Sequence, residues 1–191
     1  MTTYIVAGIG SWNRNLFDEN SVRLAGDWYF SSTPSELYAL IEAHQDVSYI
    51  FFPHWRWIVP SVITEKYNCV CFHMTDVPFG RGGSPLQNLI VRGFKDTILT
   101  ALKMDEGMDS GPVYIKRSLA LNGPASEIYV RAAKVSWSLI AEIVSKNPIP
   151  QAQSGPVTEF VRRTSDQSEI PTDLDITRVY DYIRMLDAEN Y

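Results

Sequence analysis

The sequence predicts an α/β fold, with a Rossmann-like, mostly parallel and twisted sheet and flanking helices. Short runs of β-branched and aromatic residues alternate with segments of helical periodicity, the order expected when helices connect parallel strands. Two runs, Val47 to Phe52 and Cys69 to His73, show no polar alternation, as in strands covered on both faces. The 191 residues are enough for one large domain with a substantial core.

Six strands are expected before residue 122. Each is a short β-branched or aromatic run bounded by glycine, proline or polar turn residues. The expected strands are Tyr4 to Ala7, Asp27 to Phe30, Val47 to Phe52, Cys69 to His73, Thr97 to Met104 and Val113 to Leu121.

Four helices are expected between or after these strands. Ser32 or Thr33 can cap a helix that starts at Pro34, since a proline at the first helical position lacks an N–H that would have no partner there. Apolar residues at helical spacing make the last helix the longest. The expected helices are Pro34 to Ile41, Pro60 to Tyr67, Pro85 to Val91 and Ala125 to Lys146.

The composition changes near Asn147, where NPIPQAQSGP predicts a linker. Residues 1–147 are therefore expected to form the main domain. Residues 148–191 are expected to form an appendage packed on it, with a strand-like run at 157–163 and a terminal helix from Leu174 to Ala188.

Charge and hydropathy narrow the classes of partner. The formal net charge of −5 gives no basic footprint for a nucleic-acid backbone, so we expect no nucleic-acid partner. No run approaches the roughly 20 apolar residues that span a bilayer, and the N-terminus has no basic leader. We expect a cytoplasmic protein with no membrane contact and no metal site.

The most informative stretch is Cys69 to Gly83, CVCFHMTDVPFGRGG. It places His73 at the carboxyl end of a buried strand, before a long loop rich in glycine and proline. Open α/β sheets bind their ligands at this edge, so His73 is a candidate catalytic residue. The competing interpretation is a histidine whose ring is satisfied by a backbone carbonyl at the strand end.

A second stretch, Met104 to Gly111, joins two expected strands and reads MDEGMDSG. Asp105, Glu106 and Asp109 lie in this glycine-containing turn, where a carboxylate and backbone amides can approach a ligand closely. A solvated acidic hairpin is the competing interpretation.

Together the two stretches resemble those of the formyltransferases that use 10-formyltetrahydrofolate, a family with purine, methionyl-tRNA and sugar-acting members. That family carries Asn-x-His-x-Ser-Leu-Leu-Pro-x-x-x-Gly and then an aspartate in a Leu-Asp-x-Gly turn. The matching residues here are His73, Pro78 and Gly82, and Asp109 follows at the family's spacing. The resemblance runs from about Tyr4 to Arg163 and implies the formyltransferase fold, with a catalytic domain in residues 1–147.

Three positions depart from the family pattern. Cys71 stands for the asparagine, Thr75 for the serine and Asp76 for the first leucine. In the family the asparagine donates a hydrogen bond to the formyl oxygen, and a thiol is a weaker donor. Loss of one such donor can cost roughly 3 kcal/mol of transition-state stabilisation. Either protonated His73 or a backbone amide supplies the bond, or the enzyme is slow.

The resemblance implies roles for the remaining residues. Attack of a neutral amine on a formyl carbon gives a tetrahedral intermediate, whose protons His73 and Asp109 would handle, with Cys71 beside them. The order of proton transfers is left open. The co-substrate 10-formyltetrahydrofolate is expected to be held by Trp57, Ile58, Pro78, Gly82, Met104 and Asp105.

The acceptor is expected beside the loop from Gly8 to Phe17, which follows the first strand and opens at the same sheet edge. The residues expected to bind it are Trp12, Asn13, Arg14 and Arg81. The same loop contains only Gly-x-Gly of a dinucleotide fingerprint, which is a weak signal. His54 is expected to be structural or exposed.

The resemblance implies an N-formyltransferase acting on the amine of a nucleotide-linked sugar, a UDP- or dTDP-4-amino-4,6-dideoxy sugar. The sugar-acting members are favoured by the RGGSPLQNLI stretch and the tail after residue 155. The alternatives are another small amine, either glycinamide ribonucleotide-like or aminoacyl, and a folate- or nucleotide-binding relative with impaired catalysis. Hydrolysis of the co-substrate is a further one. The aromatic residues Tyr180 and Tyr182 of the terminal helix leave a homodimer open.

Overall fold

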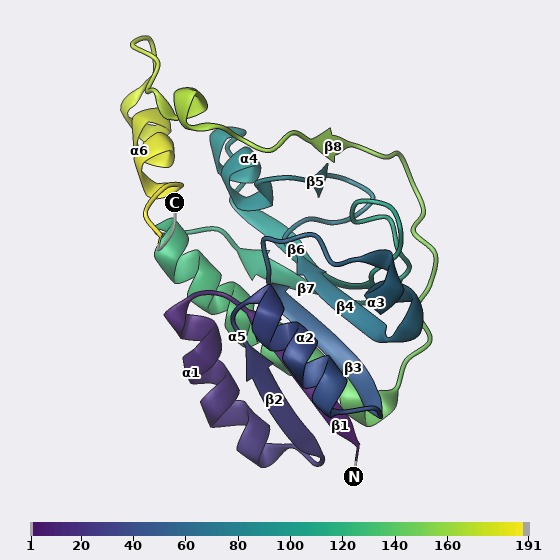
Figure 1. Cartoon of the computed structure of the whole chain (residues 1–191). Helices are drawn as coiled ribbons and strands as arrows, with labels where there is room; N and C mark the ends of the chain where they lie inside the picture. The colour runs from purple at the N-terminus through teal and green to yellow at the C-terminus, as the bar shows by residue number, and fades with distance from the viewer. Residues whose placement is uncertain (1, 189–191) are drawn as a thin grey trace.

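The computed structural model describes residues 2–188, which are built around one six-stranded mixed sheet (Figure 1). The strand order is β2-β1-β3-β4-β6-β7. The first four strands pair in parallel, and β6 and β7 pair antiparallel. The α/β fold class is confirmed. The strands are β1 (Thr3–Gly8), β2 (Asp27–Ser31), β3 (Val47–His54), β4 (Asn68–His73), β6 (Asp96–Lys103) and β7 (Val113–Ala120).

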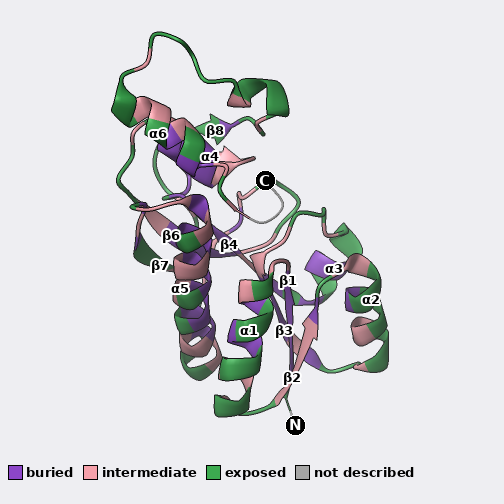
Figure 2. Ribbon diagram, turned by 90° about the vertical axis from the view of Figure 1, so that its left-hand side faces the viewer, coloured by how far each residue is buried: buried purple, intermediate pink, exposed green. Residues whose placement is uncertain are grey.

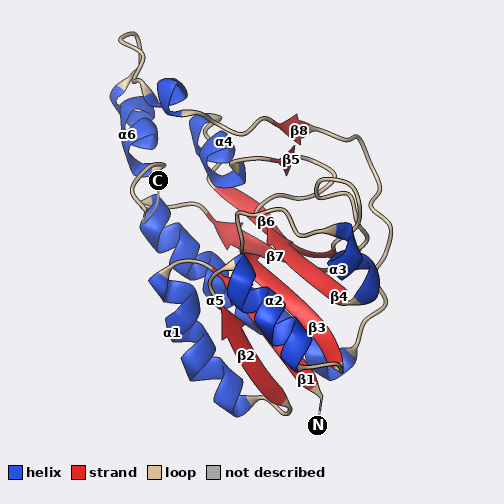
Figure 3. Ribbon diagram, viewed as in Figure 1, coloured by secondary structure: helices blue, strands red, loops and turns tan. Residues whose placement is uncertain are grey.

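Helices cover both faces of the sheet (Figures 2 and 3). The helices α1 (Ser11–Asn20) and α5 (Ala125–Lys146) pack on one face, and α2 (Pro34–Ala43) and α3 (Ser61–Lys66) pack on the other. The short helix α4 (Pro85–Val91) lies against α6 (Ile176–Arg184) beyond the edge of the sheet where β4 ends.

Two apolar cores result from the alternation of side chains along the strands. In β1, Tyr4 and Val6 join the larger core under α1 and α5, whereas Ile5 and Ala7 join the smaller one under α2 and α3. Because both faces of the central strands are buried, they contain almost no exposed polar residue.

Local signals explain most helix boundaries. The Thr33 hydroxyl accepts a hydrogen bond from the Glu36 amide, which caps α2 as expected for Pro34 at the first helical position. Asp175 caps α6 in the same way, so that helix begins at Ile176 and is shorter than predicted. The bounds of α4 and α5 match the prediction.

One helix was missing from the prediction. The segment expected as a loop from Gly8 to Phe17 is helical from Ser11, where α1 begins after Gly10 with φ of 86°. Because α1 is largely polar and buries only Asn13, Leu16 and Phe17, its sequence lacks the apolar periodicity that marks the other helices. The prediction of an open loop here was wrong.

The segment expected as a linker runs along the main sheet. Gln151 forms a bridge with Val113 of β7. Further on, β8 (Glu159–Phe160) pairs in parallel with β5 (Arg81–Gly82), which lies in the loop after β4. The strand expected at 157–163 is therefore present but short. None of the helices in the described residues combines the length and apolar character that a membrane crossing needs.

Candidate active site

His73 lies at the carboxyl end of β4 and is almost fully buried, with 7% of its surface exposed. Its Nε2 atom is 2.7 Å from the carbonyl oxygen of Gly80, in the loop that follows. A carbonyl oxygen only accepts, so Nε2 carries a proton. The other ring nitrogen, Nδ1, faces the Oδ2 atom of Asp109 at 3.4 Å. The imidazole is thus held between a carbonyl and a carboxylate.

Asp109 comes from the turn between β6 and β7. Its Oδ2 atom also accepts a hydrogen bond of 2.9 Å from the backbone N–H of Gly82. Its backbone is left-handed, with φ of 50°, which is uncommon for a residue with a side chain. Within residues 2–188 no hydrogen bond reaches Oδ1, so this oxygen is the part of the carboxylate that is open to a ligand.

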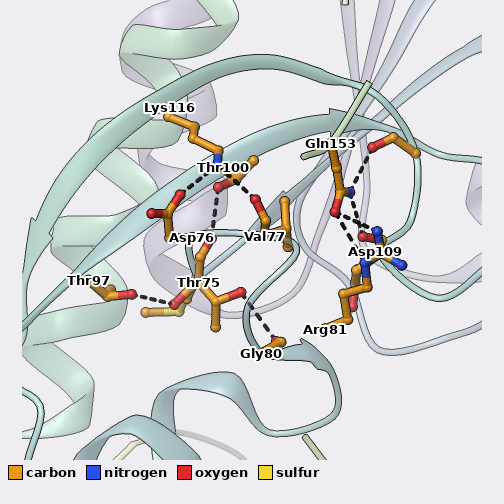
Figure 4. A network of polar contacts seen from close by, with 12 residues as sticks. Thr75, Asp76, Val77, Gly80, Arg81, Thr97, Thr100, Asp109, Lys116 and Gln153 are labelled. Atoms are coloured by element: carbon orange, nitrogen blue, oxygen red, sulfur yellow. Dashed lines mark hydrogen bonds and ion pairs between the residues drawn. The ribbon is translucent and has the colours of Figure 1, made fainter. Parts of the chain in front are cut away.

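The loop after β4 is held by threonines (Figure 4). The hydroxyl of Thr75 donates to the Gly80 carbonyl at 3.2 Å, and Thr100 of β6 donates to the Thr75 carbonyl at 2.7 Å. Because Thr75 is fully buried, these bonds fix the loop from inside. Thr75 thus supplies the same kind of hydroxyl donor that the family's serine offers at this position.

Asp76 has a different role from the leucine of the family pattern. Its carboxylate pairs with Lys116 Nζ at 2.5 Å, and the same nitrogen donates to the Val77 carbonyl at 2.7 Å (Figure 4). The pair is substantially exposed, so it contributes at most about 1 kcal/mol. It ties the outer side of the loop to β7 and leaves the site itself unchanged.

Cys71 lies two residues before His73 and faces the same side of the sheet. Burial raises the pKa of its thiol well above the usual range, and the charges of Asp109 and Asp105 raise this pKa further. The thiol is therefore neutral and is a weak hydrogen-bond donor. It cannot replace an asparagine amide as a strong donor to a developing oxyanion.

The residues expected to hold the co-substrate lie in three different settings. Trp57 is half-exposed and its ring contacts Trp55 edge to face at 4.7 Å, whereas Ile58 is 87% exposed. Ile58 also borders a cavity against α2 of only about 10 Å³, which is too small for a pterin ring. The exposed apolar surface of Trp57 can serve as a wall for a flat ring.

Met104 and Asp105 lie nearer to the histidine. Met104 packs beside Cys71 in the smaller core, and its N–H donates to the Cys69 carbonyl at 2.8 Å. The Asp105 carboxylate closes its own turn by accepting from Ser110 Oγ at 2.7 Å and from the Gly107 amide at 3.1 Å. This turn shapes one wall of the site.

Pro78 and Gly82 meet the C-terminal segment. Pro78 is buried, and its carbonyl accepts from the Thr158 N–H at 3.1 Å. Gly82 has φ of 101°, and a side chain there would approach the Phe160 carbonyl oxygen to 2.5 Å. In this arrangement the two residues shape the loop and orient Asp109.

The residues expected to bind the acceptor fall into two groups. Trp12 stacks on Tyr129 with ring centroids 5.9 Å apart, and Asn13 is fully buried, with its amide donating to the Ile9 carbonyl at 2.6 Å. The Asn13 side chain therefore faces the interior and is not placed to contact a substrate, contrary to the prediction. Arg14 is exposed and borders a cavity of about 540 Å³, together with Gly10, Ser11, Phe30, Ser32 and Glu36.

Arg81 belongs to the His73 site instead. Its Nε and Nη2 atoms donate to the Oε1 atom of Gln153 at 3.1 and 2.8 Å (Figure 4). No carboxylate in residues 2–188 lies within ion-pair distance of this guanidinium. Its charge is thus available to an anionic group.

Sequence reasoning missed Gln153, which contacts both Arg81 and the Asp109 loop. It stands in a stretch whose composition is typical of a linker, and no local pattern separates it from Gln151. The described part of the chain contains no group of three or more His, Cys, Asp or Glu that could hold a metal ion.

Comparisons with known proteins agree with this geometry. A family model described as the C-terminal domain of methionyl-tRNA formyltransferase matches residues 165–191. A methionyl-tRNA formyltransferase from Rickettsia massiliae is 30% identical over 124 residues, which cover 61% of this chain and 41% of the relative. The chain therefore spans about two fifths of the length of the curated relatives it matches.

Solved structures give a longer match. A methionyl-tRNA formyltransferase from Clostridium thermocellum is 46% identical with a TM-score of 0.91, over 100% of this chain and 86% of that one. HypX from Aquifex aeolicus in complex with tetrahydrofolic acid is 16% identical, with a TM-score of 0.78 over 99% of this chain and 35% of that one. The second likeness shows a shared fold.

Proposed function

The chain belongs to the formyltransferase family, and on that premise we propose that it transfers a formyl group from 10-formyltetrahydrofolate to a primary amine. The observation that carries the proposal is the contact between His73 and Asp109 at the carboxyl edge of the sheet. Both side chains are nearly buried, so a proton moved between them and a ligand is shielded from bulk water.

The contacts of Asp109 and His73 indicate a different role for each residue in formyl transfer. The co-substrate supplies a formyl carbonyl that is electrophilic at carbon. Asp109 Oδ1, which has no partner among the described residues, accepts the proton that the attacking amine must lose. When the intermediate collapses, the bond between the formyl carbon and the folate nitrogen breaks, and Asp109 returns the proton to that nitrogen, so tetrahydrofolate leaves. His73 donates from Nε2 to Gly80 and turns Nδ1 toward Asp109, so its ring fixes the direction in which the carboxylate points.

Negative charge develops on the formyl oxygen during attack and needs a hydrogen-bond donor. The neutral Cys71 thiol is a weak donor, so His73 is the stronger candidate in this chain. The Nε2–H group of His73 can donate its hydrogen bond to the oxyanion instead of the Gly80 carbonyl, because the two acceptors compete for the same N–H.

The acceptor class has two candidates. The curated relative from Rickettsia massiliae and the structure from Clostridium thermocellum are named for methionyl-tRNA, which favours an aminoacyl amine and runs against the expectation of no nucleic-acid partner. The predicted nucleotide-linked amino sugar is second. It is supported by the net charge of −5 and by the cavity of about 540 Å³ beside Arg14 and Glu36, which has room for a small polar ligand.

Mass spectrometry distinguishes the candidates. The protein is incubated with 10-formyltetrahydrofolate and, in separate reactions, with methionyl-tRNA and with a panel of UDP- and dTDP-linked amino sugars. One formyl group on a single acceptor identifies the substrate. Formate released equally with and without acceptor indicates a hydrolase, and folate binding without any product supports a relative with impaired catalysis.

A further inference from the structure

We propose that Gln153 is a positioning residue that holds the Asp109 loop in the conformation needed for formyl transfer. The inference rests on the proposed function, in which Asp109 accepts the amine proton. Gln153 lies 44 positions after Asp109, in the stretch whose composition resembles a linker.

The carboxamide of Gln153 uses its full hydrogen-bonding capacity. Its Nε2 atom donates to the carbonyl oxygens of Asp109 and Gly111, each at 2.8 Å. Its Oε1 atom accepts both bonds from Arg81, at 3.1 and 2.8 Å (Figure 4). Two donated and two accepted bonds satisfy the amide completely.

Arg81 fixes which way the amide points. A guanidinium only donates, so the atom that faces Arg81 must be the oxygen, and the NH₂ group must face the loop. The two loop carbonyls therefore receive the two amide hydrogens. A carboxylate at position 153 would keep the bonds from Arg81 but would place an acceptor against both carbonyls.

The loop that carries Asp109 needs these hydrogen bonds because its backbone adopts an unfavourable conformation. Asp109 has φ of 50°, a left-handed conformation that costs about 1 kcal/mol or more for a residue with a side chain. The bonds from Gln153 to the carbonyls on either side of Ser110 hold this conformation, which turns the Asp109 carboxylate toward His73 and Gly82.

Gln153 is itself anchored on both sides. Two residues earlier, Gln151 exchanges backbone hydrogen bonds of 2.7 and 2.8 Å with Val113 of β7. Five residues later, the Thr158 N–H donates to the Pro78 carbonyl at 3.1 Å. The segment therefore crosses from the hairpin that carries Asp109 to the loop that follows His73, with Gln153 between the two.

The test compares Gln153→Leu and Gln153→Glu with Gln151→Leu and Gln151→Glu in the full chain. Gln151 is a matched control because its side chain is exposed and, within residues 2–188, hydrogen-bonds only to the Ile149 carbonyl. For both Gln153 variants we expect kcat to fall about tenfold to hundredfold, since a small misplacement of a reacting group can cost this much. We expect the KM for the co-substrate to change by less than threefold.

Hydrogen exchange gives a second readout that does not depend on turnover. Amides of residues 104–112 should exchange about tenfold faster in Gln153→Leu, while those of residues 114–120 in β7 keep their protection. Both control variants should match the wild type in exchange and in kcat. Circular dichroism confirms that each variant is folded.

Three results would overturn the inference: a kcat within twofold of the wild type, a change confined to KM, or an equal loss in the Gln151 variants. If the wild-type protein transfers no formyl group to any amine tested, the proposed function itself is wrong. In that case the exchange rates would still test whether Gln153 holds the Asp109 loop. Faster exchange in Gln153→Leu alone would support this role, and unchanged exchange would overturn it.

Discussion

Two histidines end neighbouring parallel strands of the same sheet, and their surroundings differ in kind. His54 ends β3 and packs against two aromatic rings, with centroid distances of 4.7 Å to Tyr129 and 5.9 Å to Trp12. His73 ends β4 and lies between the Gly80 carbonyl and the Asp109 carboxylate. Burial and the nearby charge of Arg56 lower the pKa of His54 to about 4.

The difference shows that histidines at the same edge of a sheet can have quite different partners. Burial keeps the His54 ring neutral near pH 7, so this ring contributes packing. The His73 ring has an acceptor at each nitrogen, so it can carry and pass a proton. Variants of the two sites should therefore affect different properties of the protein.

The largest effect is expected for His73→Ala. Removing the group that holds Asp109 and donates to the oxyanion should lower kcat about a thousandfold, in the range of general acid–base catalysis. The measurement is the rate of formyl transfer to the acceptor identified by mass spectrometry, with folding checked by circular dichroism. A rate within tenfold of the wild type would remove His73 from the mechanism.

Asp109→Asn should cost somewhat less, about a hundredfold in kcat. The amide keeps the size of the side chain and an oxygen that can face the Gly82 N–H, but it has no charge and accepts a proton poorly. The KM for the co-substrate should change by less than threefold. A kcat within threefold of the wild type would show that another group takes the amine proton.

His54 should affect stability instead of turnover. The unfolded chain protonates His54 near pH 6.5, whereas the folded chain resists protonation until about pH 4. Lowering the pH through this window therefore favours unfolding, and the pKa difference corresponds to about 3 kcal/mol lost between pH 6.5 and 4. Urea unfolding at several pH values should show this loss, reduced in His54→Gln.

His44→Gln is the matched control for the substitution itself, because His44 lies at the end of α2 and its ring packs at a tilt against Tyr29, with the ring centroids 4.1 Å apart. Transfer by His54→Gln at pH 7.5 should stay within threefold of the wild type. An equal pH dependence in wild type and His54→Gln would contradict the packing role of this ring.

The same contrast explains what the sequence could predict. Strand runs, proline-started helices and the long periodic segment of α5 are local features, so the sheet and most helices were predicted with nearly correct bounds. The pairing of His73 with Asp109 was predicted because both lie in compact motifs at a characteristic spacing.

The missed features depend on contacts between distant parts of the chain. The polar helix α1 is stabilised by packing against α5. The role proposed for Gln153 depends on carbonyl groups more than forty positions away, which no local pattern reveals. The inward turn of Asn13 likewise follows from the helix that the prediction lacked.

The smallest loss of activity among the substitutions around His73 is expected for Cys71→Ala, at the position where the family has an asparagine. Because its thiol is neutral and a weak donor, Cys71→Ala should change kcat by less than threefold. Cys71→Asn would place an amide donor on the face of β4 that His73 shares, and we expect it to raise kcat about tenfold, less than the full value of an optimised oxyanion donor. A large loss of kcat in Cys71→Ala would instead show that the thiol contacts the reacting formyl group. It would also show that His73 does not supply the hydrogen bond to the formyl oxygen.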